Sequence, residues 1–143
     1  MKLKFNFGIL KNKKVRFEQI HKDKITFYEG VLKQIKEKKG TYCFIYENGN
    51  TLEISDTILT KMLITKINEQ IVFTYDINNN KLSGLVGFAM SDTYGFPIEI
   101  TEEILNERGY NLDMNGYYIL KQLQKDLSSG TFKNKDGWNN KTI

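Results

Sequence analysis

The sequence predicts an α+β fold in which a small, largely antiparallel β-barrel or curled sheet precedes a two-helix C-terminal segment. Short runs of β-branched and aromatic residues, separated by turn residues, fill the first two-thirds of the chain. After residue 90 the apolar residues recur at helical spacing. A chain of 143 residues with 40% hydrophobic residues is long enough to bury one core. We therefore expect a β-rich portion at 1–88, a helical segment at 89–128 packed on it and a tail at 129–143.

Three apolar-rich runs at the start of the chain predict strands over residues 2–10, 15–20 and 25–35. The turn-like residues Lys11 to Lys14 separate the first two runs. Gly30 lies inside the third run, where a glycine typically marks a bend or a bulge. The first 35 residues should therefore form strands joined by short turns.

The next pair of runs carries the strongest hairpin signal in the chain. Residues 41–47 and 51–54 are β-prone, and Asn48-Gly49 stands between them. Asn-Gly favours a type I′ turn because both central residues of that turn need a positive φ. The pattern predicts a β-hairpin with this turn.

A short helical turn is expected over 55–62, because Ser55 or Asp56 can cap it. Asn78 to Asn80 make a later turn. The remaining apolar runs predict the last strands, over 63–67, 71–77 and 81–88.

Two capped helices are predicted beyond residue 100. Thr101 is a suitable N-cap and Gly109 a suitable C′ residue, so one short helix should span about 102–108. Asp113 can cap a second helix, which Ser128-Ser129-Gly130 should end. The apolar stripe of this helix consists of Tyr117, Leu120, Leu123 and Leu127.

Composition excludes several kinds of site. With one cysteine, Cys43, and one histidine, His21, the chain can form neither an intramolecular disulfide nor a Cys/His zinc site of four protein ligands. No apolar run is long enough for a membrane span, and no secretory leader is visible, so we expect a cytoplasmic protein. No metal, cofactor or catalytic constellation is predicted, and we do not expect an enzyme.

Charge is unevenly distributed along the chain. Residues 1–40 hold twelve Lys or Arg against four Asp or Glu, whereas residues 41–120 hold four against eleven. Residues 121–143 are basic again, with five against two. Such a charge distribution can steer a polyanion to one face, although an unpartnered solvated surface is an equally simple interpretation.

The segment Asp92-Thr93-Tyr94-Gly95-Phe96-Pro97 predicts a rigid corner. Gly95 permits backbone geometry closed to other residues, and Pro97 forces Phe96 out of the helical region. Over about residues 90–125 the chain resembles the alanyl-tRNA synthetase family. The likeness rests on this corner followed in register by Ile98-Glu99-Ile100-Thr101, Gly109, Asp113, Gly116-Tyr117 and Gln124-Lys125.

The resemblance implies an association with tRNA recognition, because the corresponding helices of that family lie beyond its catalytic core. It implies no active site here. The chain has no room for the family's ATP- and alanine-binding domain and lacks the zinc ligands of its editing domain. As a structural alternative, the same corner would only fix how two helices pack on the sheet.

Residues 14–60 look like a small antiparallel SH3-like or Tudor-type β-barrel. Alternation places Tyr42, Phe44 and Tyr46 on one face of a strand. Because Cys43 and Ile45 between them are also apolar, burial in the core is favoured over an exposed stacking platform.

Two basic loops, one at residues 11–16 and one at residues 36–39, are candidate phosphate contacts. If six contacts formed, the logarithm of affinity should fall with the logarithm of salt concentration at a slope of about −5 for duplex RNA or DNA. Lysines that protect strand edges are the alternative interpretation. The predicted nucleic-acid or partner-binding residues of the whole chain are Lys11, Lys13, Lys14, Arg16, Lys36, Lys38, Lys39, Asp92, Thr93, Tyr94, Phe96, Asp113, Lys121 and Lys125.

The leading hypothesis is a noncatalytic binding module that engages RNA, such as a tRNA-like element, through the basic loops and the C-terminal helices. The alternative is a small phage-type inhibitor or adaptor that binds a host or partner protein. A self-associating structural piece is a third interpretation. Salt-sensitive binding of RNA, salt-insensitive capture of one protein, and a concentration-dependent mass separate the three.

Overall fold

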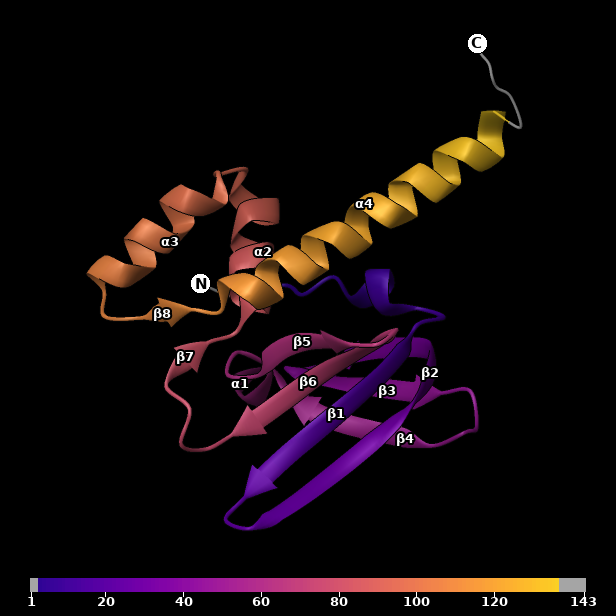
Figure 1. Ribbon diagram of the computed structural model, residues 1–143, viewed down its shortest axis with the longest axis horizontal. Coiled ribbons are helices and arrows are strands. Elements are labelled where there is room, and N and C mark those ends of the chain that lie inside the picture. The colour runs from indigo at the N-terminus through magenta and orange to yellow at the C-terminus, as the bar shows by residue number, and fades with distance from the viewer. Residues whose placement is uncertain (1–2, 137–143) are drawn as a thin grey trace.

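The computed structural model describes residues 3–136, with side chains through residue 128. A mixed six-stranded sheet and a group of helices on one side of it make up the molecule (Figure 1). The α+β class is confirmed. The strands of the large sheet are β1 (Lys14–His21), β2 (Lys24–Lys38), β3 (Thr41–Tyr46), β4 (Thr51–Ser55), β5 (Leu63–Ile67) and β6 (Gln70–Asp76). The helices are the 3₁₀-helix η1 (Phe7–Leu10), α1 (Asp56–Leu59), α2 (Gly84–Tyr94), α3 (Ile98–Glu107) and α4 (Met114–Asp136).

The large sheet is open. Its strand order is β4-β3-β2-β1-β6-β5, so β4 and β5 are edges and the described strands do not close into a barrel. Neighbouring strands are antiparallel except β1 and β6, which run parallel. A separate parallel pair, β7 (Lys81–Leu82) with β8 (Asn111–Leu112), lies among the helices. The expectation of a largely antiparallel, curled sheet therefore holds, and the closed form is not observed.

Although open, the sheet curls over its own inner face. Strands two positions apart in a flat sheet are separated by about 10 Å. The rings of Phe17 on β1 and Phe44 on β3 nevertheless have centroids 4.6 Å apart. A register shift in β2 between Leu32 and Gln34 accompanies the curl. Gly30, where a bend was predicted, packs so tightly that a Cβ there would lie 3.1 Å from the Tyr46 ring.

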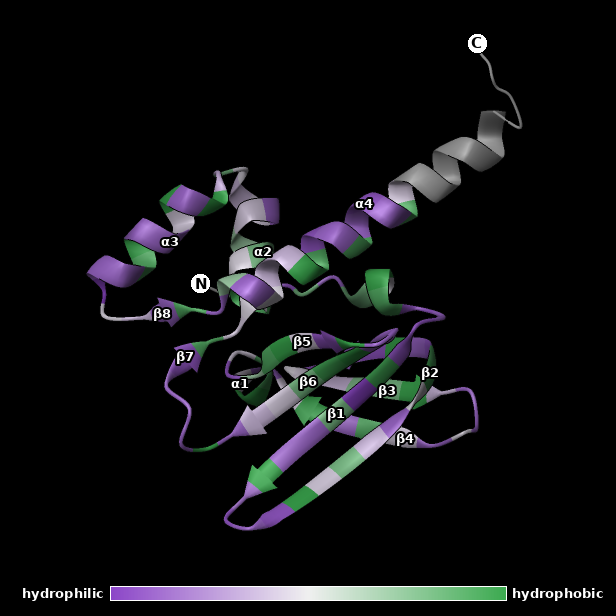
Figure 2. Cartoon of the chain, in the orientation of Figure 1, coloured by the Kyte–Doolittle hydropathy of each residue, from purple (hydrophilic) through white to green (hydrophobic). Residues whose placement is uncertain are grey.

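An aromatic core fills the curl. Phe17, Phe44 and Phe73 are fully buried, and Tyr42 and Tyr46 are nearly so, as alternation along β3 predicted. Burial raises the pKa of Tyr46, whose hydroxyl donates to the Tyr28 carbonyl at 3.2 Å. In Figure 2 the elements η1, α1 and β5 are largely green, whereas α3 and the first half of α4 alternate green and purple. Helices α3 and α4 thus have one apolar side each.

Two predicted strands are wrong over part of their length, residues 7–10 and 84–88, whereas residues 81 and 82 do form the strand β7. Residues 7–10 form η1 because Asn6 caps the turn, its side chain accepting from the Gly8 N–H, and consecutive apolar residues are buried. Residues 84–88 belong to α2, which Ser83 caps by accepting from the Leu85 N–H at 3.1 Å. The first six residues of α2 are buried all round. A short apolar run without periodicity does not distinguish a buried helix from a strand.

The hairpin of β3 and β4 is confirmed, but its predicted turn type is wrong. Among the described residues around this turn only Gly49 has a positive φ, and the loop has four residues, closed by a hydrogen bond from the Tyr46 N–H to the Asn50 carbonyl. Longer hairpin loops of this kind need one left-handed residue rather than two. Positive φ at two successive residues occurs instead at Lys39 and Gly40, between β2 and β3.

The two predicted helices are present with different bounds. The first starts at Ile98 rather than after Thr101, because Pro97 takes the N-cap position and Thr101 is buried inside the helix. Gly109 ends it with φ 86° as predicted. The second helix, α4, begins after Asp113 and continues through Ser128-Ser129-Gly130 to Asp136. The remainder of the predicted tail, 137–143, lies outside the described residues.

Candidate functional site

The corner predicted from the sequence joins α2 to α3. Helix α2 ends at Tyr94, and Gly95 follows in the left-handed region with φ 72° and ψ 14°, its N–H donating to the Ser91 carbonyl at 2.8 Å. Pro97 then takes the N-cap position of α3, which begins at Ile98. Since a left-handed residue reverses the chain at the end of a helix, the corner projects Tyr94 and Phe96 outward. These side chains are 41% and 45% exposed, and their rings lie nearly parallel with centroids 6.0 Å apart.

A cleft of about 290 Å³ opens between this corner and α4. It contains three of the predicted binding residues, Asp92, Phe96 and Lys121, which come from segments 25 or more positions apart. The other lining residues are Phe88, Ser91, Gly95, Pro97, Ile98 and Tyr117. Burial raises the pKa of Tyr117, which keeps its hydroxyl protonated at neutral pH. The cleft therefore offers one carboxylate, one ammonium group and an exposed aromatic rim.

Close contact between α2 and α4 fixes the shape of the cleft. A Cβ on Gly84 would lie 2.3 Å from the Tyr117 backbone nitrogen and 2.8 Å from the Asp113 carbonyl oxygen. Only a glycine lets the two backbones approach so closely. Tyr117 is 5% exposed and packs beside Phe88 of α2. Lys121, one turn further along α4, is thereby held at the mouth of the cleft, where its Nζ donates to Gln124 Oε1 at 3.3 Å.

Asp113 lies apart from the cleft surface and is 7% exposed. Its Oδ1 accepts from the Gly116 N–H at 3.0 Å, which caps α4 as the sequence predicted. Its Oδ2 accepts from the Ile64 N–H at 3.0 Å, which ties α4 to the edge strand β5. Both carboxylate oxygens therefore already have partners inside the protein. Thr93 is exposed at the end of α2, and Lys125 is exposed on α4.

Lys11 lies on a different face of the sheet from Lys36 and Lys38. Lys11 lines a cavity beside Glu37 and Tyr42, on the inner side of the sheet. Lys36 and Lys38 alternate with Glu37 along β2 and line a separate surface cavity together with Lys39. Because successive residues of a strand point to opposite faces, Lys11 does not share a patch with Lys36 and Lys38. Lys13 and Lys14 are exposed at the start of β1.

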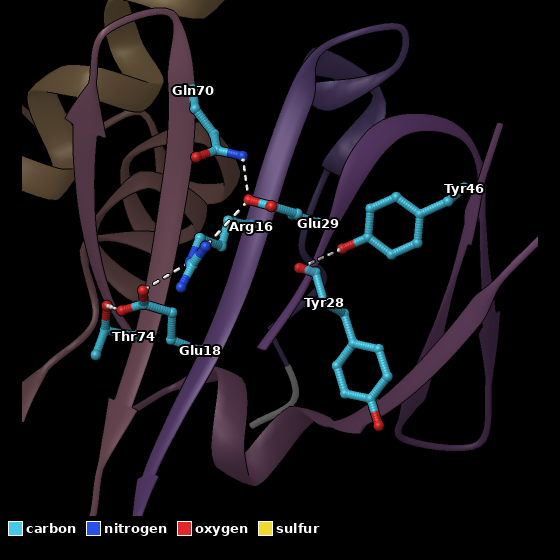
Figure 3. A network of polar contacts seen from close by, with 7 residues as sticks. All are labelled: Arg16, Glu18, Tyr28, Glu29, Tyr46, Gln70 and Thr74. Carbon is cyan, nitrogen blue, oxygen red and sulfur yellow. Dashed lines mark hydrogen bonds and ion pairs between the residues drawn. The ribbon is translucent and has the colours of Figure 1, made fainter. Parts of the chain in front are cut away.

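Arg16 lies in a polar network on the outer face of the sheet (Figure 3). Its Nε is 2.7 Å from Glu18 Oε2, and one terminal nitrogen is 3.1 Å from Glu29 Oε1. Its guanidinium also stacks on the Phe27 ring, 3.6 Å from the centroid. Thr74 donates to the second oxygen of Glu18 at 3.2 Å. The guanidinium is thus already paired with two carboxylates and offers an external phosphate less free charge than the exposed lysines do.

We expect the Glu29 carboxylate of this network to make stability sensitive to acid. Hydrogen bonds from Gln70 and then Arg16 lower the pKa of Glu29 below its usual 4.5. A lowered pKa stabilises the fold above about pH 4.5, and this contribution is lost as the pH falls through the folded-state value. Because Glu29 is 44% exposed, the contribution should be below about 1 kcal/mol. Urea unfolding of the Glu29→Gln variant between pH 3 and 7 should therefore show a shallower loss of stability in acid than the parent; an identical pH profile would contradict this.

Sequence reasoning did not identify Lys4 and Lys33, which line the same cavity as Lys11. Nor did it identify Ser91 and Tyr117 as lining residues of the cleft. Each cavity draws its residues from stretches that are far apart in the sequence, so no local spacing marked them. The excess of lysine in residues 1–40 was the one available signal for Lys4 and Lys33.

In the part of the chain that the structure describes, no three or more His, Cys, Asp or Glu side chains gather as potential metal ligands. No helix described there is both long and apolar enough to cross a membrane.

Comparison with known proteins places the chain in a family. Residues 16–142 match the family model described as tRNA synthetases class II (A). The chain is 39% identical over 67 residues to the alanine–tRNA ligase of Buchnera aphidicola, a match covering 47% of this chain and 8% of that protein. It is 43% identical over 65 residues to the alanine–tRNA ligase of Rickettsia typhi, covering 41% and 7%.

The chain is also 32% identical over 101 residues to the alanine–tRNA ligase of Aliarcobacter butzleri. This match covers 66% of this chain and 11% of that protein. Matches to these relatives thus span about a tenth of their length or less. No solved structure matches the chain. Because the family model extends over most of the sequence, from Arg16 in β1 to residue 142, the chain belongs to the class II (A) tRNA synthetase family.

Proposed function

We propose that this chain is a noncatalytic RNA-binding module that engages tRNA or a tRNA-like element through its helical corner and its basic loops. The relatives are named as alanine–tRNA ligases, and the match includes the corner and the start of α4. The single observation that carries the proposal is the cleft, which gathers Asp92, Phe96 and Lys121 beside the exposed Tyr94 and Phe96 rings.

The cleft suits a nucleotide chemically. Exposed aromatic rings stack on bases, at about 1–3 kcal/mol per base. The Lys121 ammonium is suited to a phosphate, and the Asp92 carboxylate accepts from base amino groups or the ribose hydroxyl. The cleft contains neither histidine nor cysteine and only one carboxylate. We therefore assign it binding and no reaction.

Charge supports a particular orientation of the RNA. The β-rich portion carries most of the basic residues, while α3 carries Glu99, Glu102, Glu103 and Glu107. Phosphates should follow the two basic loops, at residues 11–16 and 36–39, and the lysines of α4, and avoid the exposed side of α3. We therefore expect the RNA to reach the cleft from the side of α4 and not from the side of α3.

We expect the double variant Lys121→Glu with Lys125→Glu to bind a fluorescently labelled tRNA transcript about tenfold or more weakly than the parent. The charge reversal removes two phosphate contacts. The slope of the logarithm of affinity against the logarithm of salt concentration should therefore become less steep by about two. Fluorescence anisotropy at several salt concentrations measures both quantities.

The matched control is Lys22→Glu with Lys24→Glu, which makes the same change of charge at the tip of the β1–β2 hairpin, far from α4 in Figure 1. This variant should retain most of the affinity. Equal losses in the two variants, or no binding by the parent at low salt, would contradict the proposal. Salt-insensitive capture of one defined protein in place of RNA would favour the protein-binding adaptor.

A further inference from the structure

A second cavity, of about 320 Å³, lies on the opposite face of β2 from the cavity lined by Lys36, Lys38 and Lys39. It is formed where the N-terminal segment crosses the inner side of β2 and β3. Lysines from three separate places in the chain, Lys4, Lys11 and Lys33, line it, with Glu37 as its one acidic side chain. Its volume is at the lower end of the range for small-molecule sites, about 300–1,000 Å³.

The base of this cavity is rigid. Phe5 and Phe7 pack against Tyr42 with ring centroids 5.9 and 5.0 Å away. The Phe5 N–H donates to the Tyr42 hydroxyl oxygen at 3.3 Å, which fixes the N-terminal segment on β3. All three rings are at most 6% exposed, so they support the cavity and leave no face for a base to stack on. The rest of the lining consists of the three lysines together with Asn6, Gly8, Gln34, Ile35 and Glu37.

The ammonium groups are available for an anion. Among the side chains of residues 3–128 neither Lys4 nor Lys11 has an ion-pair or hydrogen-bond partner. Lys33 has only weak partners, Asn12 Oδ1 at 3.4 Å and Glu47 Oε1 at 3.9 Å, both on exposed side chains. Three lysines, set against Glu37 in the cavity and Glu47 beside the Lys33 ammonium, leave a local excess of one positive charge. Such an excess is unfavourable unless water, salt or a bound anion offsets it.

We infer that this cavity binds a phosphate group, with Lys4, Lys11 and Lys33 as its ligands. Lysine serves as a mobile point charge for phosphate, and three of them can surround a tetrahedral anion without the planar fork that arginine would impose. The phosphate belongs either to an RNA backbone or to a small phosphate ester. The RNA case rests on the proposed function, whereas binding of the phosphate group itself does not.

The test is a titration of the ¹⁵N-labelled protein with inorganic phosphate, followed by the backbone amide signals of Phe5, Gly8, Lys11 and Lys33, with sodium chloride at equal ionic strength as the reference. We expect saturable shifts at these amides. The variant Lys4→Gln with Lys11→Gln and Lys33→Gln should weaken phosphate binding about tenfold or more, because it removes charged hydrogen bonds. The matched control is Lys36→Gln with Lys38→Gln and Lys39→Gln, which removes the same charge from the other cavity and should leave the affinity unchanged.

Absence of saturable shifts in the parent, or equal losses in both triple variants, would overturn the inference. Titrations with adenosine monophosphate and with tRNA then identify the source of the phosphate. If the first triple variant also weakens tRNA binding, the ligand is the RNA backbone; if only the small phosphates are affected, it is a small ester. The Lys121 and Lys125 variant keeps its phosphate shifts in either case, so failure of the proposed function would not be mistaken for failure of this inference.

Discussion

Replacing Gly84 with alanine should unfold the helical segment or destabilise the protein by about 3 kcal/mol or more. The added methyl would lie 2.3 Å from the Tyr117 nitrogen, 2.7 Å from the Gly116 carbonyl carbon and 2.8 Å from the Asp113 oxygen. All three are backbone atoms, so no side-chain rotation can relieve the clash. Helices α2 and α4 would have to separate, and the cleft between them would widen.

The sign of the effect makes this test sharp. In a helix that is free of such contacts, the same change from glycine to alanine stabilises by about 1 kcal/mol. Urea denaturation followed by circular dichroism measures the difference. Thr93→Ala, at an exposed position of the same helix, should change stability by less than about 0.5 kcal/mol. A Gly84→Ala variant as stable as its parent would show that the two helices do not pack this closely.

Gly87 offers a graded comparison. A Cβ there would meet Leu112 Cδ2 at 2.8 Å and Ile98 Cδ1 at 3.2 Å, both ends of flexible side chains. Gly87→Ala should therefore cost less than Gly84→Ala, since those side chains can move.

Asp113→Ala should cost about 2–4 kcal/mol of stability. Loss of a helix N-cap costs about 0.5–2 kcal/mol, and a buried N–H left without a partner costs about 1–3 kcal/mol. Asp113 supplies both contributions, because its two oxygens accept from Gly116 at the start of α4 and from Ile64 on β5. Equilibrium unfolding in urea measures the total.

Ser55→Ala is the control for Asp113, because Ser55 caps only the short helix α1, accepting from the Ile58 N–H at 3.3 Å. It should cost about 0.5–2 kcal/mol, the value of a cap alone. Hydrogen exchange adds a local readout: the Ile64 amide should lose protection in Asp113→Ala and keep it in Ser55→Ala. Equal costs for the two variants would mean that the bond to Ile64 contributes nothing.

The features predicted correctly from the sequence are those that depend on a few neighbouring residues. The hairpin around Asn48-Gly49, the cap at Asp113 and the left-handed Gly109 are all local. The corner at Gly95 also follows from its own residues. Local chemistry decides such features because the partners that satisfy them lie within a few positions.

Features that depend on distant contacts were not predictable in the same way. Helix α2 has no polar face, so its apolar residues show no helical periodicity. Only the burial of this segment against α4 favours a helix over a strand. The left-handed pair at Lys39-Gly40 lacks the usual Asn-Gly signal. Likewise, the cavity lined by Lys4, Lys11 and Lys33 exists only because the N-terminal segment crosses β2.

The parallel pairing of β1 with β6 has a consequence for how the chain acquires its structure. Residues 15–20 align with 71–76, so more than fifty residues must be in place before this contact can form. Pairings between such remote segments slow folding, because a large loop has to close first. During synthesis on the ribosome one side of β1 therefore stays open to wrong partners until β6 emerges, and a fragment truncated before residue 70 should aggregate rather than fold.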